Sequence, residues 1–461
     1  MYTISNRLKT FSIILIVLGV LGVAYGFMTS HKSLDEIKTM LAEEHAHDAA
    51  ADAHAIAGDA HAAANDQLIA AENYNPDAVV ATELEQASPD AHAEHVQAQL
   101  AKRPWSALYV AAFFFMMIAL GALVFYAIHI AAQAGWSPLL MRVMEGISAY
   151  LLPGAIIVVA IAVGSHYIGT NNEIFIWMND DVVAGDKLIQ NKSGYLNITA
   201  FLIRAAIFIA GWCTYRHFAR KFSLAQDTAE PGDNKYFVKS FRIAAGFLVF
   251  YIYSESVMSW DWIMSVDPHW FSTLFGWYIL AGMIVSAVTV IAMVAIYLKS
   301  KGLLPMVNDS HIHDLAKYMF GFSIFWAYLW FSQFMLIWYA NIPEEVTYFV
   351  TRIEDYKLPF FGMLVLNFVF PFLILMNSDY KRVPWFVIMA GVLVLVGHYV
   401  DIFVMIMPGT VGDRWFIGIP EIASVLFFLG LFLLVVFTSL TKAPLTPKHN
   451  PFIKESENFH Y

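Results

Sequence analysis

The chain has 461 residues, of which 59% are hydrophobic and 14% are charged, with a formal net charge of −10. In soluble domains roughly a quarter of the residues are charged, so this composition excludes an ordinary soluble protein and indicates a membrane protein. The single cysteine, Cys213, excludes an intrachain disulfide, and it excludes cysteine-ligated iron–sulfur clusters and CxxCH haem attachment within this chain alone. The sequence has no P-loop, and nothing in it points to a nucleic acid partner.

Most apolar residues lie in runs of about 18 residues or more, the length that a helix needs to cross a hydrocarbon core of roughly 30 Å. Membrane β-barrels instead show short segments of alternating polarity. The sequence therefore predicts an all-α integral membrane protein with about ten transmembrane helices. After a first run that ends at Met28, the predicted spans are 105–133, 147–168, 198–215, 240–258, 273–298, 315–340, 358–376, 384–407 and 416–438.

The first run begins near Phe11 and resembles the hydrophobic part of a signal peptide. It is long for such a region, and Ala24-Tyr25-Gly26 makes a poor cleavage site. We expect residues 1–28 to be a retained N-terminal transmembrane anchor.

The next segment, 29–103, has a different composition. It holds 21 Ala, seven of the sixteen His and 14 acidic residues against 4 Lys or Arg, whereas the remaining chain balances at 23 acidic and 23 basic residues. This segment therefore carries the whole net charge, and it is too polar to span a membrane. We expect an acidic, Ala- and His-rich segment outside the bilayer, with a helix near Leu34–Ala57.

The distribution of Lys and Arg predicts the orientation of the spans. Six basic residues fall between 216 and 242, whereas the loop near 259–272 has none and the loop near 341–357 is acidic. We expect a multi-pass protein of the bacterial inner membrane with both termini in the cytoplasm, 29–103 in the periplasm and a cytoplasmic tail after the last span within 408–461.

Few titratable residues fall within or beside the predicted spans. Each charged one costs about 2.5–3.5 kcal/mol on insertion scales, so each needs a partner or a function. All except one are predicted in the outer half of the membrane, which suggests that protons or a polar head group are handled there. The exception is His129, and the others are His166, Arg204, Glu255, Asp261, His398, Asp401 and Glu421.

His398 and Asp401 are three residues apart and share a face of the ninth predicted span. A quinol that gives up two electrons also releases two protons, so its site needs a histidine or carboxylate as acceptor. A carboxylate beside an imidazole favours the protonated imidazole, which makes proton transfer between them feasible. The pair can equally be structural and hold the ninth span against its neighbours.

The other candidates also have two interpretations. Arg204 is expected to pair with one of the outer acids, and Glu255, within Tyr253-Ser254-Glu255-Ser256, is either a proton carrier or a structural glutamate. Glu421 follows Pro420 at a helix start, where the helix dipole favours an acid. His166 has the position of a solvated boundary histidine.

No metal site is predicted. The histidines of the acidic segment lie in low-complexity sequence without cysteines, and only His129, His166 and His398 fall within spans, too few for the paired histidines of a bis-haem bundle. The Trp-rich loop 259–272 fits an interfacial aromatic belt and is also a possible docking surface for a partner.

Three motifs carry a resemblance to a known family: Ser259-Trp-Asp-Trp-Ile-Met-Ser-Val-Asp-Pro-His-Trp270, Phe331-Ser-Gln-Phe-Met335 through Trp338-Tyr-Ala-Asn-Ile-Pro343, and Gly397-His-Tyr-Val-Asp401. Over roughly 105–440 the chain resembles the NrfD/polysulfide-reductase membrane subunits, and most closely the ActF-type subunit of bacterial alternative complex III. The resemblance implies two four-helix bundles, here 104–258 and 273–407, with the first and last spans outside them.

The resemblance also implies a subunit of a quinol-oxidising electron-transfer complex that has no redox cofactor of its own. Its partners would be a second NrfD-like subunit, haem c and iron–sulfur subunits and membrane lipids, with menaquinol or another quinol and structural lipids as ligands. The chain would contribute a proton path or a quinol site and anchor the peripheral subunits. The alternatives are a purely structural scaffold and, ranked last, a secondary transporter, which would need broken helices around a midplane site.

Overall fold

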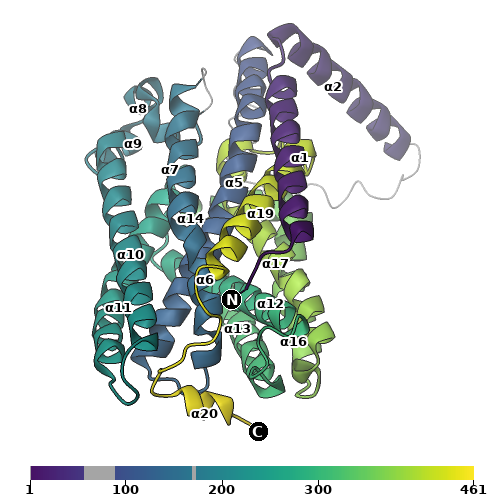
Figure 1. The fold of residues 1–461 in the computed structure, drawn as a ribbon. Helices are drawn as coiled ribbons and strands as arrows, with labels where there is room; N and C mark the ends of the chain where they lie inside the picture. The colour runs from purple at the N-terminus through teal and green to yellow at the C-terminus, as the bar shows by residue number, and fades with distance from the viewer. Residues whose placement is uncertain (1, 57–88, 169–172, 461) are drawn as a thin grey trace.

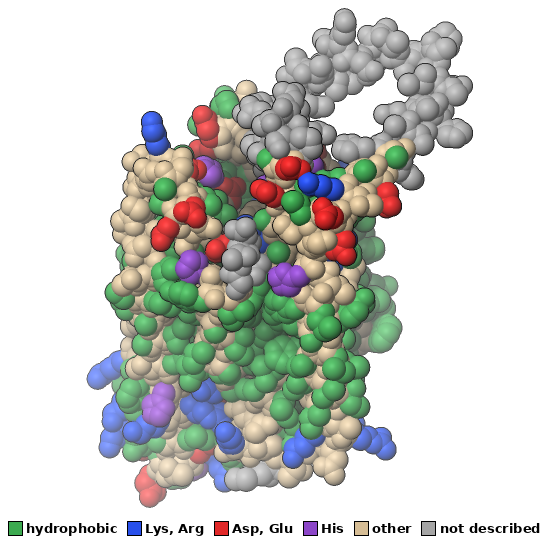
Figure 2. Space-filling model, turned by 90° about the horizontal axis from the view of Figure 1, so that it is seen from above, with side chains coloured by type: hydrophobic (Ala, Val, Ile, Leu, Met, Phe, Trp, Pro, Cys, Tyr) green, Lys and Arg blue, Asp and Glu red, His purple; other side chains and the backbone are tan. Residues whose placement is uncertain are grey.

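The computed structural model describes residues 2–56, 89–168 and 173–460, and Figure 1 shows a long bundle of helices. Ten of its helical segments are long and apolar enough to cross a membrane, and the described residues contain no strand. This confirms the prediction of an all-α integral membrane protein with ten spans. On the face seen in Figure 2, hydrophobic side chains form a broad band with charged side chains gathered along its two borders.

The first bundle contains four spans that contact one another in a ring. They are α5 (Pro89–Ala131), the segment Pro138–Tyr167 that ends in α7 (Leu151–Tyr167), α10 (Ile198–Asp227) and α11 (Lys235–Trp262). The short helices α8 (Asp180–Gly185) and α9 (Lys187–Lys192) lie between α7 and α10, and α6 (Met141–Ile147) precedes α7.

The second bundle repeats this arrangement with the next four spans. They are α12 (Phe275–Ser300), α13 (Asp309–Ala340), the segment Lys357–Leu375 and α17 (Pro384–Ile406). The third of these comprises α15 (Lys357–Leu364), a π-helical turn at Val365–Val369 and α16 (Phe370–Leu375). The short helix α14 (Pro343–Glu354) follows α13 in the chain, and the short helix α18 (Pro408–Val411) follows α17.

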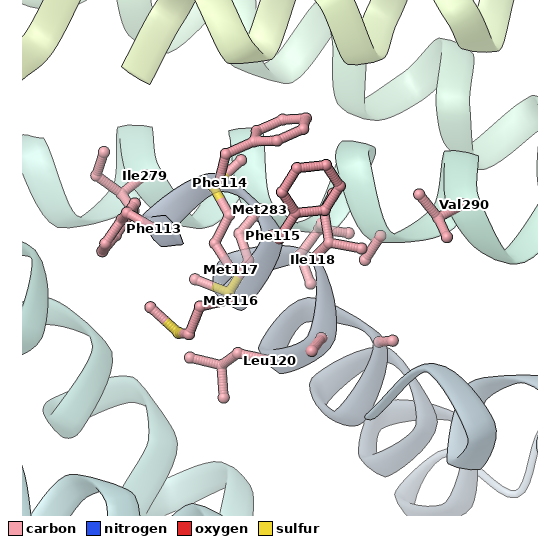
Figure 3. Close-up of a cluster of buried hydrophobic side chains, with 14 of the residues drawn as sticks. Phe113, Phe114, Phe115, Met116, Met117, Ile118, Leu120, Ile279, Met283 and Val290 are labelled. Carbon is pink, nitrogen blue, oxygen red and sulfur yellow. The ribbon is translucent and has the colours of Figure 1, made fainter. Parts of the chain in front are cut away.

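The two bundles meet along α5 and α12, the most buried spans of the structure. In their most apolar windows 94% of α5 and 89% of α12 is buried, against 28% of α10. Figure 3 shows side chains of both helices in one core, among them Phe113 and Met117 with Ile279 and Met283. A Cβ atom at Gly121 would lie 2.7 Å from the Met283 carbonyl oxygen, so the close approach of the backbones requires glycine here.

The first and last spans lie outside both bundles, as predicted. α1 (Asn6–Ser30) packs along α19 (Ile419–Leu440), and both contact α5. The short α20 (Ile453–Glu457) follows near the C-terminus, whereas α2 (Leu34–Ile56) projects at the opposite end of the molecule (Figure 1). We call these the α20 end and the α2 end. Which end faces the cytoplasm stays a prediction from the charge distribution.

Two predicted boundaries fall inside helices. α5 begins at Pro89, so residues 89–103 continue the second span instead of closing the acidic segment. Pro104 does not end this helix, and Ile37 and Leu41 of α2 pack against its first turns. The Trp-rich segment 259–272 likewise begins within the last turn of α11.

Candidate functional site

The titratable residues that were predicted in the outer half of the membrane lie at the α2 end, but the structure divides them among separate places. His398 and Asp401 lie in the second bundle, and Arg204 and Asp261 lie in the first. The three further members, Glu255, Glu421 and His166, lie apart from both pairs, and His129 lies near the α20 end of α5. One continuous cluster is therefore not formed.

Asp401 is the centre of the most enclosed of these places. Its side chain is almost fully buried, and it accepts hydrogen bonds from the Tyr278 hydroxyl of α12 and, at 2.9 Å, from the Trp326 Nε1–H of α13. His398 Nδ1 lies 3.5 Å from the carboxylate, as their shared helix face predicted. Three helices thus hold one carboxylate in a site walled by aromatic rings, among them Trp326, which packs edge-on against His398.

The irregular turn of the neighbouring span faces this site. Pro371 has no N–H with which to bond the Asn367 carbonyl, and the backbone adopts a π-helical turn in which Phe370 N–H donates to Val365 O. The Asn367 side chain is fully buried with Nδ2 3.5 Å from His398 Nδ1. A Cβ atom at position 397 would lie 2.1 Å from Asn367 Oδ1, so Gly397 makes this approach possible.

Two polar atoms of this site have no hydrogen-bond partner within the described chain. They are Asn367 Oδ1 and His398 Nε2, and both residues are fully buried. Because an unpaired buried polar atom costs about 1–3 kcal/mol, these atoms mark a place suited to a water molecule or to a transferred proton.

In the first bundle, Arg204 pairs with Asp261, as expected for an arginine near the outer acids. Arg204 Nε lies 2.6 Å from Asp261 Oδ2, and its guanidinium lies 4.0 Å from the centre of the Tyr195 ring. Burial and the nearby carboxylate of Asp261 raise the pKa of Tyr195, which lies just outside the span. Arg204 is partly exposed although Asp261 is fully buried, whereas both side chains of the His398–Asp401 pair are buried.

Glu255 lies deeper in the first bundle and is 1% exposed. Its Oε1 atom has no hydrogen-bond partner within the described residues. The hydroxyl of Ser254 accepts a hydrogen bond from Trp212 Nε1–H at 2.9 Å. Within the residues that the structure describes, Glu255 is thus a buried carboxyl group without a cationic partner, which distinguishes it from Asp261.

Glu421 forms the best-connected ion pair at the α2 end. Both carboxylate oxygens lie 2.8 Å from nitrogens of Arg103, and Oε2 also accepts the Gly418 N–H at 2.8 Å. The Arg103 guanidinium lies 3.2 Å from the centre of the Phe416 ring. This pair joins α19 to α5, so its geometry favours a structural role for Glu421.

The two remaining candidates are isolated from these places. His129 Nδ1–H donates a 2.7 Å hydrogen bond to the Phe125 carbonyl oxygen, and aromatic rings surround the imidazole. His166 Nδ1 lies 3.8 Å from Glu173 Oε1 at the rim of the first bundle. Neither contacts the Asp401 site.

The Trp-rich loop is held by the loop that precedes α10. Trp177 Nε1–H donates to Ser265 O at 3.0 Å, Lys192 donates to Pro268 O at 2.6 Å, and His269 Nε2 lies 2.5 Å from Asp186 Oδ2. On its other side, Trp270 stacks on Tyr348 of α14 at 3.8 Å. The loop therefore bridges the two bundles as a fixed element of the α2 end.

The Asp186–His269 contact predicts a pH-dependent loop. Burial raises the pKa of Asp186, but hydrogen bonds from His269 and two backbone N–H groups outweigh it and leave the pKa below its ordinary 3.8. The stabilisation is therefore complete above pH 3.8 and is lost as the pH falls through the lower folded value. We expect Asp186→Asn to accelerate hydrogen exchange in residues 263–272 at neutral pH by an amount equivalent to about 0.2–1 kcal/mol.

Asp181→Asn provides the control for this prediction, because Asp181 lies in the same loop and is exposed. It should leave exchange in residues 263–272 unchanged. Equal protection in wild type and Asp186→Asn at neutral pH would show that the contact does not hold the loop.

A second charged network, at the α20 end of the first bundle, escaped prediction. Arg142 lies 3.0 Å from Glu145 and 2.6 Å from Asp227, and Glu145 also accepts hydrogen bonds from Arg220 at 3.0 Å and Ser223 at 2.5 Å. The only signal in the sequence is the three-residue spacing of Arg142 and Glu145 at the start of a span. In the Asp401 site, no sequence pattern pointed to the uncharged residues Tyr278, Trp326 and Asn367.

The described residues contain no group of three or more His, Cys, Asp or Glu side chains placed to hold a metal ion. His61 of the acidic segment lies outside the described residues. No protein-family model matches the chain, and no curated protein matches it.

Proposed function

We propose that the chain is a proton-conducting membrane subunit of a quinol-oxidising electron-transfer complex. The observation that supports this most directly is the Asp401 site, a buried carboxylate with a histidine, a tyrosine and a tryptophan on three helices. The family resemblance of the three sequence motifs supplies the quinol and the complex.

The Asp401 site has the groups that a proton relay needs. A buried carboxylate is costly unless hydrogen bonds stabilise its charge, and the Tyr278 O–H and Trp326 N–H do so. His398 lies between this carboxylate and Asn367, with its second ring nitrogen unpaired. A proton that reaches Asp401 can therefore pass to His398 and leave from Nε2 toward a water molecule.

The first bundle offers a second line of titratable groups toward the α20 end. Glu255 precedes Asp261 by six residues, which places it about 9 Å farther along α11. Beyond it are the buried hydroxyls of Tyr251, Tyr215 and Tyr126, and then Glu145 in its arginine network. Proton conduction across the membrane would use these hydroxyls together with bound water.

Glu255→Gln tests this second line. The substitution keeps the shape of the side chain but removes its proton, so we expect quinol-driven proton transfer by the complex in sealed vesicles to fall by about tenfold or more. Glu230→Gln is the control, because Glu230 is exposed at the α20 end. Unchanged proton transfer in an intact Glu255→Gln complex would remove Glu255 from the path.

A scaffold without a proton or quinol site is the alternative, and α2 favours it. This helix projects from the bundle. It touches the bundle through a small apolar contact of Ile37 and Leu41 with α5 and through two exposed ion pairs, Lys38–Asp90 and Glu44–Arg414. Replacing residues 33–88 with a flexible linker keeps α1 and α5 intact. Loss of peripheral subunits with an unchanged effect of Asp401→Asn on quinol turnover would show that anchoring and proton transfer are separate functions.

If both Asp401→Asn and Glu255→Gln leave turnover and proton release normal, and the linker variant still loses its partners, the scaffold is the correct function. The linker variant and the two substitutions therefore decide between the alternatives independently.

A further inference from the structure

The charges of the network at the α20 end do not balance. Arg142, Arg216 and Arg220 supply three guanidinium groups, whereas the carboxylates within it are Glu145 and Asp227. Arg142 contacts both carboxylates and Arg220 contacts Glu145, but no carboxylate in the described part of the chain forms an ion pair with Arg216. Arg216 is thus a half-buried cation without an anionic partner.

Arg216 is held in place by a neutral group. Its Nε–H donates to the Ser148 hydroxyl at 3.1 Å, at the turn that leads into α7. Together with Glu145, Ser148 and Arg220, it lines a small hollow between α5, α10 and the turn that joins α6 to α7. Because Ser148 cannot carry a negative charge, this contact orients the guanidinium without neutralising it.

The surface above Arg216, toward the middle of the membrane, is apolar. On α7, Leu152 and Ile156 follow Ser148 at intervals of four residues, so they lie on the same helix face, and they are 46% and 53% exposed. On α10, Cys213 and Ile209 precede Arg216 by three and seven residues and are half-buried. The adjoining surfaces of α7 and α10 are therefore apolar along their length and cationic at the α20 end.

The surroundings at this end are also basic. Lys221, Lys235 and Lys239 lie near the aromatic rings of Phe218, Phe222 and Tyr236, and none of the three lysines forms an ion pair in the described chain. The exposed acids of the adjoining loop are Glu230 and Asp233. Clustered lysine and arginine side chains at a membrane boundary attract anionic lipids.

We propose that this surface of α7 and α10 binds one anionic phospholipid, with its phosphate on Arg216 and an acyl chain along Leu152 and Ile156. The phosphate supplies the negative charge that Arg216 lacks, and hydrogen bonds between a guanidinium and a phosphate are among the strong ones in proteins. We expect a zwitterionic phospholipid to bind the same surface less well, because its ammonium group would meet the neighbouring guanidinium of Arg220.

The proposal is tested by titrating the detergent-solubilised full-length chain with phosphatidylglycerol and with phosphatidylcholine of the same acyl chains, and counting bound lipid by native mass spectrometry. We expect the wild type to prefer phosphatidylglycerol and Arg216→Gln to bind it about tenfold more weakly. Arg242→Gln is the matched control, because Arg242 is an exposed arginine at the same end of α11, and it should keep the wild-type affinity.

Ser148→Asp keeps the proposal testable if Arg216→Gln fails to fold. The new carboxylate pairs with Arg216 within the chain, so the variant should fold and lose its preference for phosphatidylglycerol. The proposal is wrong if wild type shows no preference, if a folded Arg216→Gln or Ser148→Asp chain retains it, or if Arg242→Gln weakens binding as much as Arg216→Gln. Displacement of the lipid by inorganic phosphate alone would identify a free-anion site and overturn the assignment to a lipid.

Discussion

Asp401→Asn is expected to lower quinol-dependent electron transfer by the assembled complex by about 10²-fold. The amide keeps the size of the carboxylate. Its oxygen can accept the hydrogen bond from Trp326, and its NH2 group can donate to the Tyr278 hydroxyl, which can also act as an acceptor. The amide cannot take up a proton from a quinol and therefore cannot pass one on to His398. The measurement is the rate of quinol oxidation by purified complex whose subunit composition matches the wild type.

The control for Asp401→Asn is Asp309→Asn in the same bundle, where Asp309 pairs with Lys299 at the surface of the α20 end. It should leave turnover unchanged. Tyr278→Phe removes one donor to Asp401 while keeping the titratable group, so an intermediate rate is expected. A normal rate in an intact Asp401→Asn complex would exclude Asp401 from proton transfer.

Glu421→Gln is expected to be the most destabilising substitution among the candidate residues. Arg103, which is 8% exposed, would lose the one carboxylate with which it pairs in the described part of the chain. Removing one member of a buried ion pair costs about 3–5 kcal/mol. The effect should be seen as a lower midpoint of thermal unfolding of the detergent-solubilised chain. The assembled complex should retain its quinol turnover below that temperature.

Glu44→Gln is the matched comparison for Glu421→Gln. Glu44 also pairs with an arginine, Arg414, but its side chain is 47% exposed, so the expected loss is about 1 kcal/mol or less. Replacing both members of the buried pair, as Arg103→Met with Glu421→Leu, should recover part of the stability lost in Glu421→Gln. Equal effects of Glu44→Gln and Glu421→Gln would show that burial does not strengthen the pair.

The irregular turn at Val365–Val369 shows how local sequence and packing combine. Pro371 is visible in the sequence and implies that the Asn367 carbonyl lacks its helical partner. That the Asn367 side chain then meets His398 depends on the register between this span and α17 and on Gly397, which leaves space for it. We predicted residues 358–376 as one uninterrupted span, and Pro371 alone could not have said what an irregular turn would face.

By itself, the sequence determined the helical class, the ten spans and the adjacency of His398 and Asp401. These depend on the length of apolar runs and on the 3.6-residue period, which are local properties of the chain. Only the tertiary structure decided which side chains meet across helices. Arg103 and Glu421 are 318 residues apart, and Tyr278 and Asp401 are 123 apart.

The physical reason is that contacts between membrane helices depend on packing and on small residues that let backbones approach, because the bilayer already satisfies the apolar faces. Ten apolar helices can pack in several arrangements that bury similar amounts of surface. Only the arrangement found in the structure brings Tyr278 and Trp326 into contact with Asp401. The predicted outer cluster therefore separated into distinct places in the two bundles, although every helix that carries it had been predicted.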